Sequence, residues 1–520
     1  MKRIAVVALA FALVMGVHAS SGPASGVVTQ EWVARYNGPG NGWDHAAALA
    51  VDGSGNVYVT GNAYSASTNN DYTTVKYDSG GTQQWIKTYN GPGNSSDSAT
   101  ALALDGSGNV YVTGGSYSNS TGTDYATVKY DSAGTQQWVK RWEQSGTDLA
   151  MDLAVDGSGN VYVTGRSDYW GGTADDIWTV KYDTDGNFKW SERYNGPGNN
   201  TDWPQDITVV GSSAIYVAGY SYQGASTGID YTMVRYGSDG KEWWVHNMNC
   251  TANGQDEALA VAVDGSDNSY FTGYCDNGGT NLDDYATVKL DALGVSGWTR
   301  YYNSGTNHTD YGLDVAVDGS GNVYVTGTSY SGWSTGYDYA TVKYDSAGTQ
   351  QWVKTYNGTG NGWDGDTALA LDGSGNVYVT GGSIGTGGED DVDYATVEYD
   401  SAGTEQWAIR YNGSANGADS TVALAVDGSG NVYVTGTSYG GASTNYDYAT
   451  VKYSQAGGAG VGGIAELPDV APGGAQPSDA PPEGSGWSGG TYAALAAGVA
   501  AAALALAGAG WYARRRWLKA

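Results

Sequence analysis

Short stretches of alternating apolar and polar residues recur along the chain at a nearly constant distance. The first, residues 48–61, reads ALAVDGSGNVYVTG: an apolar run, a turn rich in Gly, Asp and Asn, and a second apolar run. Alternation with period two is typical of β-strands, and such turns join antiparallel neighbours. A period of 51 to 55 residues indicates a propeller or solenoid. The tyrosine of the second run marks the eight copies: Tyr58, Tyr111, Tyr162, Tyr216, Tyr270, Tyr324, Tyr378 and Tyr433.

One repeat contains four such strands, which we expect at 47–51, 57–60, 71–77 and 84–89. Four short antiparallel strands per repeat, joined by tight turns, predict a propeller blade. Small alanines place the first strand at the crowded axis, and the tryptophan of the fourth strand suits the wide rim. The connections after the second strand are longer and more variable, as at 61–70, 165–175, 327–337 and 381–392.

The repeat count also predicts how the ring closes. Eight sets of the first three strands end at Tyr453, and no fourth strand follows the last set. A strand of the fourth type instead precedes the first set, at 29–36. We therefore predict an all-β, eight-bladed propeller of four-stranded antiparallel blades. In this fold 29–36 pairs with 447–453, completes the last blade and removes the open sheet edge.

The repeated motif resembles a known family. ALAVDGSGNVYVTG at 48–61, with DYATVKYD following it in later copies, is similar to the bacterial SBBP beta-propeller repeat. The resemblance covers roughly residues 29–453. It implies an extracytoplasmic propeller without a well-defined chemistry. The family name implies seven blades, whereas the eight copies here predict eight.

The two ends of the chain differ from the repeats. Residues 1–19 join two positive charges to a short apolar run and predict a secretory signal peptide, followed by the propeller at 27–453. Residues 454–490, rich in Gly, Ala, Pro and Ser, predict a flexible stalk. The uncharged residues 491–513 predict a transmembrane helix, and the basic residues 514–520 a cytoplasmic tail. We expect a single-pass protein at the cell surface with its N-terminus outside; whether a sorting enzyme removes the anchor stays open.

Acidic residues outnumber basic ones, 54 against 24, for a net charge of −30 at pH 7. The electrostatic field of a chain with this negative charge repels nucleic acid and anionic membrane surfaces. The charge could attract cations or basic partners, or serve solubility alone. We expect no nucleic-acid partner, contact with the membrane only through the C-terminal helix, and a monomeric ectodomain.

Tryptophans in the variable loops are the candidate ligand-binding residues. Aromatic rings beside Asn, Asp and Ser suit sugar rings or a protein epitope, and variable loops on a rigid ring often carry function. The alternative is that these rings only pack between blades. The candidates are Trp43, Trp170, Trp203, Trp333 and Trp363.

Two aspartates recur in every repeat. They form either a ring of carboxylates that binds Ca²⁺ or a set of acceptors for backbone N–H groups at strand starts. We expect the second, because a feature of every repeat is more often structural, and we predict no cofactor. The first set is Asp44, Asp97, Asp148, Asp202, Asp256, Asp310, Asp364 and Asp419. The second set is Asp71, Asp124, Asp176, Asp230, Asp284, Asp338, Asp393 and Asp447.

Cys250 and Cys275 are the only cysteines, and the strand order places both on the face of the variable loops. They are a candidate disulfide in a secreted protein; two free thiols are the alternative. The histidines beyond the signal peptide, His45, His246 and His308, lie in three different blades and match no catalytic or metal motif.

The sequence therefore predicts a non-enzymatic binding or adhesion module. We expect it to act through the connections that follow the second and fourth strands, on an unidentified extracellular glycan or protein. One alternative is an extracellular polysaccharide hydrolase or lyase with a carboxylate pair near the channel. The other is a structural component of the cell envelope.

Overall fold

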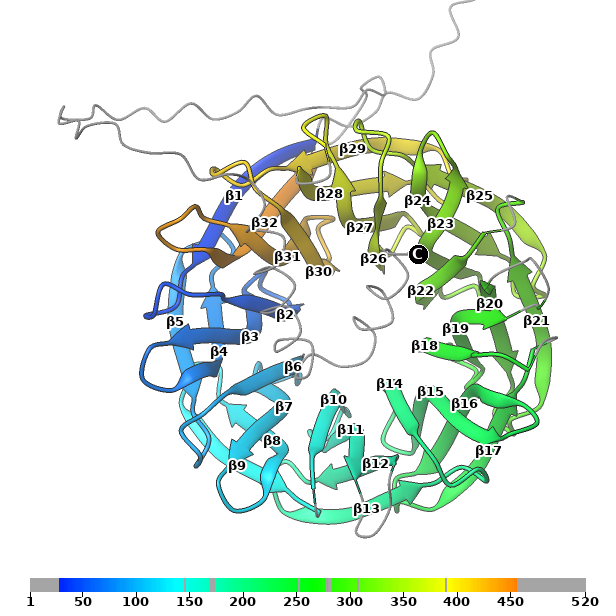
Figure 1. Ribbon diagram of the computed structural model, residues 1–520, viewed down its shortest axis with the longest axis horizontal. Helices are drawn as coiled ribbons and strands as arrows, with labels where there is room; N and C mark the ends of the chain where they lie inside the picture. The colour runs from blue at the N-terminus through cyan, green and yellow to red at the C-terminus, as the bar shows by residue number, and fades with distance from the viewer. Residues whose placement is uncertain are drawn as a thin grey trace, which may run out of the picture.

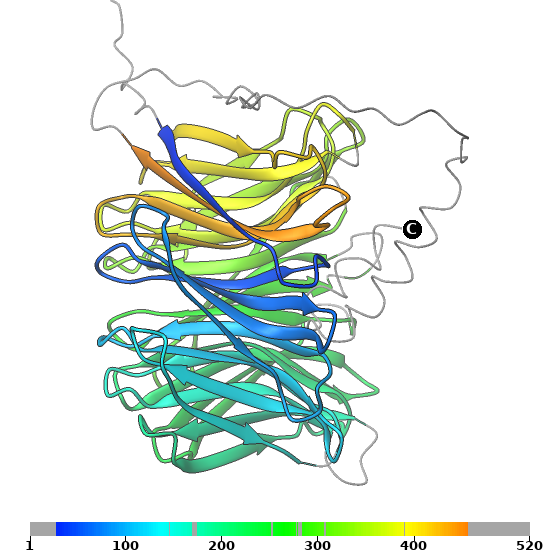
Figure 2. The same cartoon turned by 90° about the vertical axis from the view of Figure 1, so that its left-hand side faces the viewer.

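The computed structural model describes residues 28–455, except 145, 169–173, 251–252, 277, 279–282, 306–307 and 389–390. Its strands form eight four-stranded antiparallel sheets, set as blades around one axis (Figure 1). Seen edge-on, the strands run between two opposite faces of the ring (Figure 2). The predicted signal peptide, transmembrane helix and cytoplasmic tail, and the stalk beyond its first two residues, lie outside the described residues. Within the described part, no helix is suited to crossing a membrane.

The strands of each blade follow one another from the axis to the rim. The innermost strands are β2 (His45–Val51), β6 (Asp97–Leu104), β10 (Asp148–Val155), β14 (Asp202–Val210), β18 (Glu257–Val263), β22 (Asp310–Val317), β26 (Asp364–Leu371) and β30 (Asp419–Val426). The second strands are β3 (Val57–Ser65), β7 (Val110–Ser118), β11 (Val161–Asp168), β15 (Ala214–Gly224), β19 (Ser269–Asp276), β23 (Val323–Gly332), β27 (Val377–Ile384) and β31 (Val432–Tyr439). The third strands are β4 (Asn69–Tyr77), β8 (Gly122–Tyr130), β12 (Asp175–Tyr182), β16 (Gly228–Gly237), β20 (Asp283–Leu290), β24 (Gly336–Tyr344), β28 (Val392–Tyr399) and β32 (Tyr446–Gln455). The outer strands are β5 (Gln83–Tyr89), β9 (Gln136–Trp142), β13 (Phe188–Tyr194), β17 (Glu242–Met248), β21 (Ser296–Tyr302), β25 (Gln350–Tyr356), β29 (Glu405–Tyr411) and β1 (Val28–Tyr36).

Strand β1 closes the ring. It lies on β32 as the outer strand of the eighth blade, whose order is β1-β32-β31-β30 (Figure 1). The antiparallel register runs from Val28 opposite Gln455 to Tyr36 opposite Tyr448. The predicted pairing, the eight blades and the all-β fold are confirmed. Val28 and Gln455, the first and last described residues, therefore lie side by side at the rim of the ring.

The connections between second and third strands are shorter than the sequence predicts. Strand β3 continues past residue 60 to Ser65, and β4 begins at Asn69, so the expected loop 61–70 is mostly strand. The same holds for β23 and β24, which leave only 333–335 between them. The backbone groups of these polar segments pair across the hairpin, which satisfies them without an apolar side-chain pattern. The variable segments 61–70 and 327–337 are therefore projecting hairpins rather than open loops.

Neighbouring blades are joined at the rim by a tryptophan set against a glycine. The indole N–H of Trp85 donates to the Ser132 carbonyl of the next blade at 3.3 Å. A Cβ on Gly134 would lie 2.9 Å from that indole, and its φ of +80° also favours glycine. This explains why each turn before an outer strand carries Gly. The pairs are Trp32–Gly81, Trp85–Gly134, Trp138–Gly186, Trp190–Gly240, Trp244–Gly294, Trp298–Gly348 and Trp352–Gly403.

Candidate functional site

The connections divide between two faces of the ring. Turns from the first to the second strand and from the third to the fourth lie on one, which we name the tight-turn face. Hairpin tips between second and third strands, and the loops into the next blade, lie on the other, the long-loop face. The tight turns are nearly alike; in one, Asp52 Oδ1 accepts N–H groups of Ser54 and Asn56 at 2.9 and 3.0 Å. Differences between blades are therefore concentrated on the long-loop face.

The first set of repeated aspartates fastens the long-loop connections together. Asp97 Oδ2 accepts the Gly91 N–H at 2.6 Å, and its Oδ1 accepts the Tyr117 N–H at 2.8 Å. The carboxylate thus ties the loop before its strand to the hairpin of the same blade, which fits the structural interpretation. All eight aspartates of the set, listed above, have no exposed surface.

The second set lies under the hairpins and is also buried. Asp447 and Asp393 form ion pairs with Arg35 and Arg410, at 3.0 and 2.9 Å. Asp71 accepts the Thr68 hydroxyl at 2.6 Å. These contacts also lie within the blades and give the second set a structural role.

Stability should depend on pH through these groups. Burial raises the pKa of five members of the first set to about 6, against about 3.9 in an unfolded chain. Between pH 4 and 6 the folded state then binds more protons than the unfolded state, so the free energy of unfolding falls as pH rises. We expect a lower melting temperature at pH 7.5 than at pH 5, and calorimetry at both values measures it. A melting temperature that rises from pH 5 to 7.5 would contradict this. The five are Asp44, Asp148, Asp202, Asp256 and Asp419.

Below about pH 4 the free energy of unfolding should instead fall as pH falls. Although burial raises the pKa of Asp52, hydrogen bonds from Asn56, Ser54 and Tyr58 bring it below its usual value. A depressed pKa stabilises the fold above the unfolded value, and this stabilisation is lost as pH falls further. The same shift occurs at Asp105, Asp264, Asp318 and Asp427. We therefore expect the melting temperature to decrease again below about pH 4.

Cys250 and Cys275 are joined by a disulfide, with their Cα atoms 5.8 Å apart. The bond ties the loop before β18 to strand β19. The second, fourth, seventh and eighth blades place a Gly and a Ser in contact here, and a Cβ on Gly91 would lie 2.2 Å from Ser116 Oγ. Among the described residues, the metal-ligand types that converge within 4.8 Å are these two cysteines and Asp256. Because both sulfurs are in the disulfide, this group does not indicate a metal site.

Removing the disulfide should destabilise the fold by about 3.5 kcal/mol, the loop-entropy contribution for a sequence separation of 25 residues. The double variant Cys250→Gly/Cys275→Ser restores the pair found in other blades and so removes the bond with little steric change. Urea unfolding of the variant and of reduced wild type should give the same loss. An unchanged unfolding midpoint in both would contradict the stabilising role.

The structure separates the candidate tryptophans into two kinds. Trp203 stacks on Arg166 at 4.6 Å and donates to Asp175 at 3.1 Å. Trp363 lies against the backbone of the same blade, where a Cβ on Gly365 would be 2.8 Å from its ring. Both indole groups therefore pack against other residues of the propeller. Trp170 lies outside the described residues.

Trp333 and Trp43 are the exposed members of the set. Trp333 sits between β23 and β24 with 94% of its surface exposed, edge-on to His308 at 6.3 Å. Trp43 is 37% exposed and lies 4.9 Å from Tyr446. They belong to different blades, so the structure does not bring the five tryptophans into one site. Burial lowers the pKa of His45, beside Trp43, to about 4 and keeps this imidazole neutral.

Three aspartates on the innermost strands were not recognised in the sequence. Asp152, Asp206 and Asp314 occupy a position where the other five blades have Ala. Each carboxylate accepts an N–H of the next blade, as Asp152 does from Ile207 at 3.0 Å and Asp314 from Leu369 at 2.8 Å. Burial raises the pKa of Asp314 to about 7. In the sequence, these residues are marked only by having Asp where the other blades have Ala. Their hydrogen bonds join neighbouring blades.

A second group of carboxylates lies in the fifth blade. Burial raises the pKa of Glu257 to about 7, while the Tyr274 hydroxyl opposes the shift. Burial and the neighbouring Asp276 raise the pKa of Asp283 to about 7, and Tyr311 hydrogen-bonds to it. The rings of Tyr274 and Tyr311 meet edge to face at 5.0 Å. Carboxyl groups with such pKa values are suited to exchanging protons near neutral pH.

Comparisons with known proteins concern the fold. Among solved structures, the chain is similar to a eukaryotic initiation factor at 8% identity, covering 80% of this chain and 89% of that one, with a TM-score of 0.41. It is similar to the beta-propeller domain of the Trilobed protease from Pyrococcus furiosus at 10% identity, covering 70% and 92%, with a TM-score of 0.39. A comparison with curated proteins finds no match. Residues 297–333 match the SBBP beta-propeller repeat, so the chain carries the repeat that its motif indicated.

Proposed function

We propose that this protein is a surface-anchored binding or adhesion module that acts through its long-loop face. One observation carries the proposal: Val28 and Gln455 are paired, and both lie on the tight-turn face. A chain that is anchored through its C-terminal segment is therefore attached from that face. The long-loop face then lies opposite the point of attachment and is free to contact the surroundings of the cell.

The chemistry of the long-loop face supports the same proposal. Exposed Trp333 stands on a hairpin that the buried Asp310 holds through the Tyr330 N–H. Exposed Trp43 stands on a loop that the buried Asp44 holds through the Gly38 N–H. Rigid aromatic side chains at exposed positions lose little entropy on binding and suit sugar rings or a protein surface. The proposed partner is an extracellular glycan or protein.

The test is binding of the labelled protein to a glycan array and to a panel of extracellular proteins. We expect signals that Trp333→Ala weakens about tenfold or more, since a central aromatic contact contributes about 2 kcal/mol. The matched control is Phe188→Ala, an exposed aromatic residue (55%) at the tight-turn face. Equal losses in both variants, or no binding to any glycan or protein, would contradict the proposal.

A second candidate function is hydrolysis of an extracellular polysaccharide. The observation that favours it is the pair Glu257 and Asp283, whose pKa values burial raises to about 7. Glycosidases use two carboxyl groups, one of them protonated near neutral pH. Release of reducing ends from any array polymer, lost in Glu257→Gln, would favour the enzyme over the binding module.

A further inference from the structure

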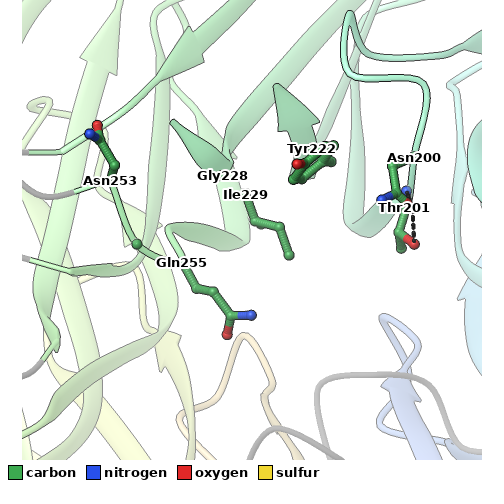
Figure 3. A pocket seen from close by; sticks show the side chains of 8 residues that line it. Asn200, Thr201, Tyr222, Gly228, Ile229, Asn253 and Gln255 are labelled. Carbon is green, nitrogen blue, oxygen red and sulfur yellow. Dashed lines mark hydrogen bonds between the residues drawn. The ribbon is translucent and has the colours of Figure 1, made fainter. Parts of the chain in front are cut away.

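A hollow of about 420 Å³ lies on the long-loop face between the fourth and fifth blades (Figure 3). Its walls come from the β15–β16 hairpin and from the loops that lead into β14 and β18. Tyr222 and Ile229 belong to the hairpin, Asn200 to the first loop, and Asn253 and Gln255 to the second. The volume falls within the range of small-molecule sites, roughly 300–1,000 Å³.

The side chains around this hollow are uncharged, although the chain carries a net charge of −30. Asn200 Oδ1 accepts the Thr201 N–H at 2.9 Å, and Asn253 Oδ1 accepts from Asn249 at 3.1 Å. Their oxygen atoms are thus engaged, which leaves amide N–H groups as donors. Within the described part of the chain, the amide of Gln255 has no hydrogen-bond partner. Tyr222 and Ile229 supply apolar surface beside the side chains of Asn200 and Gln255 (Figure 3).

The wall that carries Asn253 and Gln255 is held firmly. The disulfide anchors the start of its loop, and Asp256 accepts the N–H groups of Cys250 and Asp276, both at 2.8 Å. Gln255 forms a parallel bridge with Ile229, which fastens the loop to the hairpin of the preceding blade. Among the junctions between blades that the structure describes, this is the one that contains a disulfide. A rigid wall reduces the entropy lost when a ligand binds.

We infer that this hollow binds a neutral saccharide of one or two hexose units. Amide donors and acceptors match sugar hydroxyls, and the Tyr222 ring with Ile229 matches the apolar face of a pyranose. The lining offers no cation for an anionic sugar and no carboxylate for a basic ligand. The inference rests on the proposed function, because it assigns a ligand class to one part of the long-loop face.

The test is titration of the full chain with cellobiose, maltose, lactose and N,N′-diacetylchitobiose, followed by saturation-transfer NMR and calorimetry. We expect saturable binding of at least one disaccharide. Gln255→Ala and Asn200→Ala should each weaken it about five- to tenfold, the loss expected for about one hydrogen bond. Both side chains are exposed, so the variants should fold as the wild type does. Phe188→Ala, on the tight-turn face, should leave this binding unchanged.

The variants separate failure of this inference from failure of the proposed function. Disaccharide binding that Trp333→Ala abolishes and Gln255→Ala retains would overturn the hollow as the site, while the binding function of the face would stand. No binding of any of the four disaccharides would overturn the inference, whatever the array shows. An array and a protein panel that are both negative would overturn the proposed function as well.

Discussion

Deletion of residues 28–36 is expected to open the ring and to remove most of its stability. These residues form β1, whose loss leaves β32 as an unpaired edge strand. The deletion also removes Trp32, which packs 6.2 Å from Tyr77 in the first blade and 6.2 Å from Tyr433 in the eighth. Since a whole fold is stable by about 5–15 kcal/mol, a loss on the order of 5 kcal/mol leaves little folded protein. Thermal unfolding and gel filtration measure the loss and the resulting aggregation.

A permuted chain provides the matched control. It begins at Asn37 and joins Tyr453 to Gln30 through Asp-Ser-Ala-Gly-Thr, the sequence that links Tyr130 to Gln136. Gln30 already lies opposite Tyr453, as Gln136 lies opposite Tyr130, so the turn should fit without a change of register. We expect the permuted chain to unfold near the wild-type temperature. If it is as unstable as the deletion, β1 does not act as an outer strand of the eighth blade.

Trp298→Ala should cost about 3–5 kcal/mol, as large-to-small substitutions of buried aromatic residues do. The side chain is 8% exposed, its indole N–H donates to the Ser346 carbonyl at 3.3 Å, and its ring lies 5.9 Å from Tyr344. The substitution would leave a cavity between the fifth and sixth blades and remove one of the two donors to the Ser346 carbonyl, the other being the Lys289 ammonium group at 3.2 Å. Chemical denaturation measures the change in the free energy of unfolding.

Trp333→Ala removes the same side chain from the neighbouring blade at a site that is 94% exposed. Its expected cost is within about 0.5 kcal/mol, because little packing is lost. The contrast tests the separation of structural from surface tryptophans. Similar costs at both positions would show that the rim contacts do not hold the blades together.

The period of the sequence was sufficient to predict the ring. Alternation and turn residues locate the four strands of a blade, and the unmatched strand at 29–36 predicts closure, because an outer strand without a blade needs a partner. The hairpin ends, such as Gly61 to Ser65, were missed since polar strand ends pair through their backbone and carry no apolar pattern. Asp152 was overlooked because its role depends on a contact with the next blade.

The candidate site was less predictable for a related reason. Trp333 is exposed, whereas Trp363 packs against its own blade. This difference depends on how far a hairpin projects and on what packs against it. The hollow near Gln255 gathers residues from a hairpin and two loops, none of which forms a motif. Cys250 and Cys275 did mark this junction in the sequence, although only the structure shows what the disulfide supports.

The most direct test of the closed ring is a cross-link between its two ends. Thr29 lies opposite Ser454 in the register of β1 and β32, so Thr29→Cys/Ser454→Cys should form a disulfide within one chain. The control pair Thr29→Cys/Ser374→Cys places the second cysteine on a tight turn of the seventh blade, where no pairing with β1 exists. Mass spectrometry of the digested, unreduced monomer should find the 29–454 link in high yield and no 29–374 link. A 29–454 link found only in dimers, or absent altogether, would contradict the closed ring.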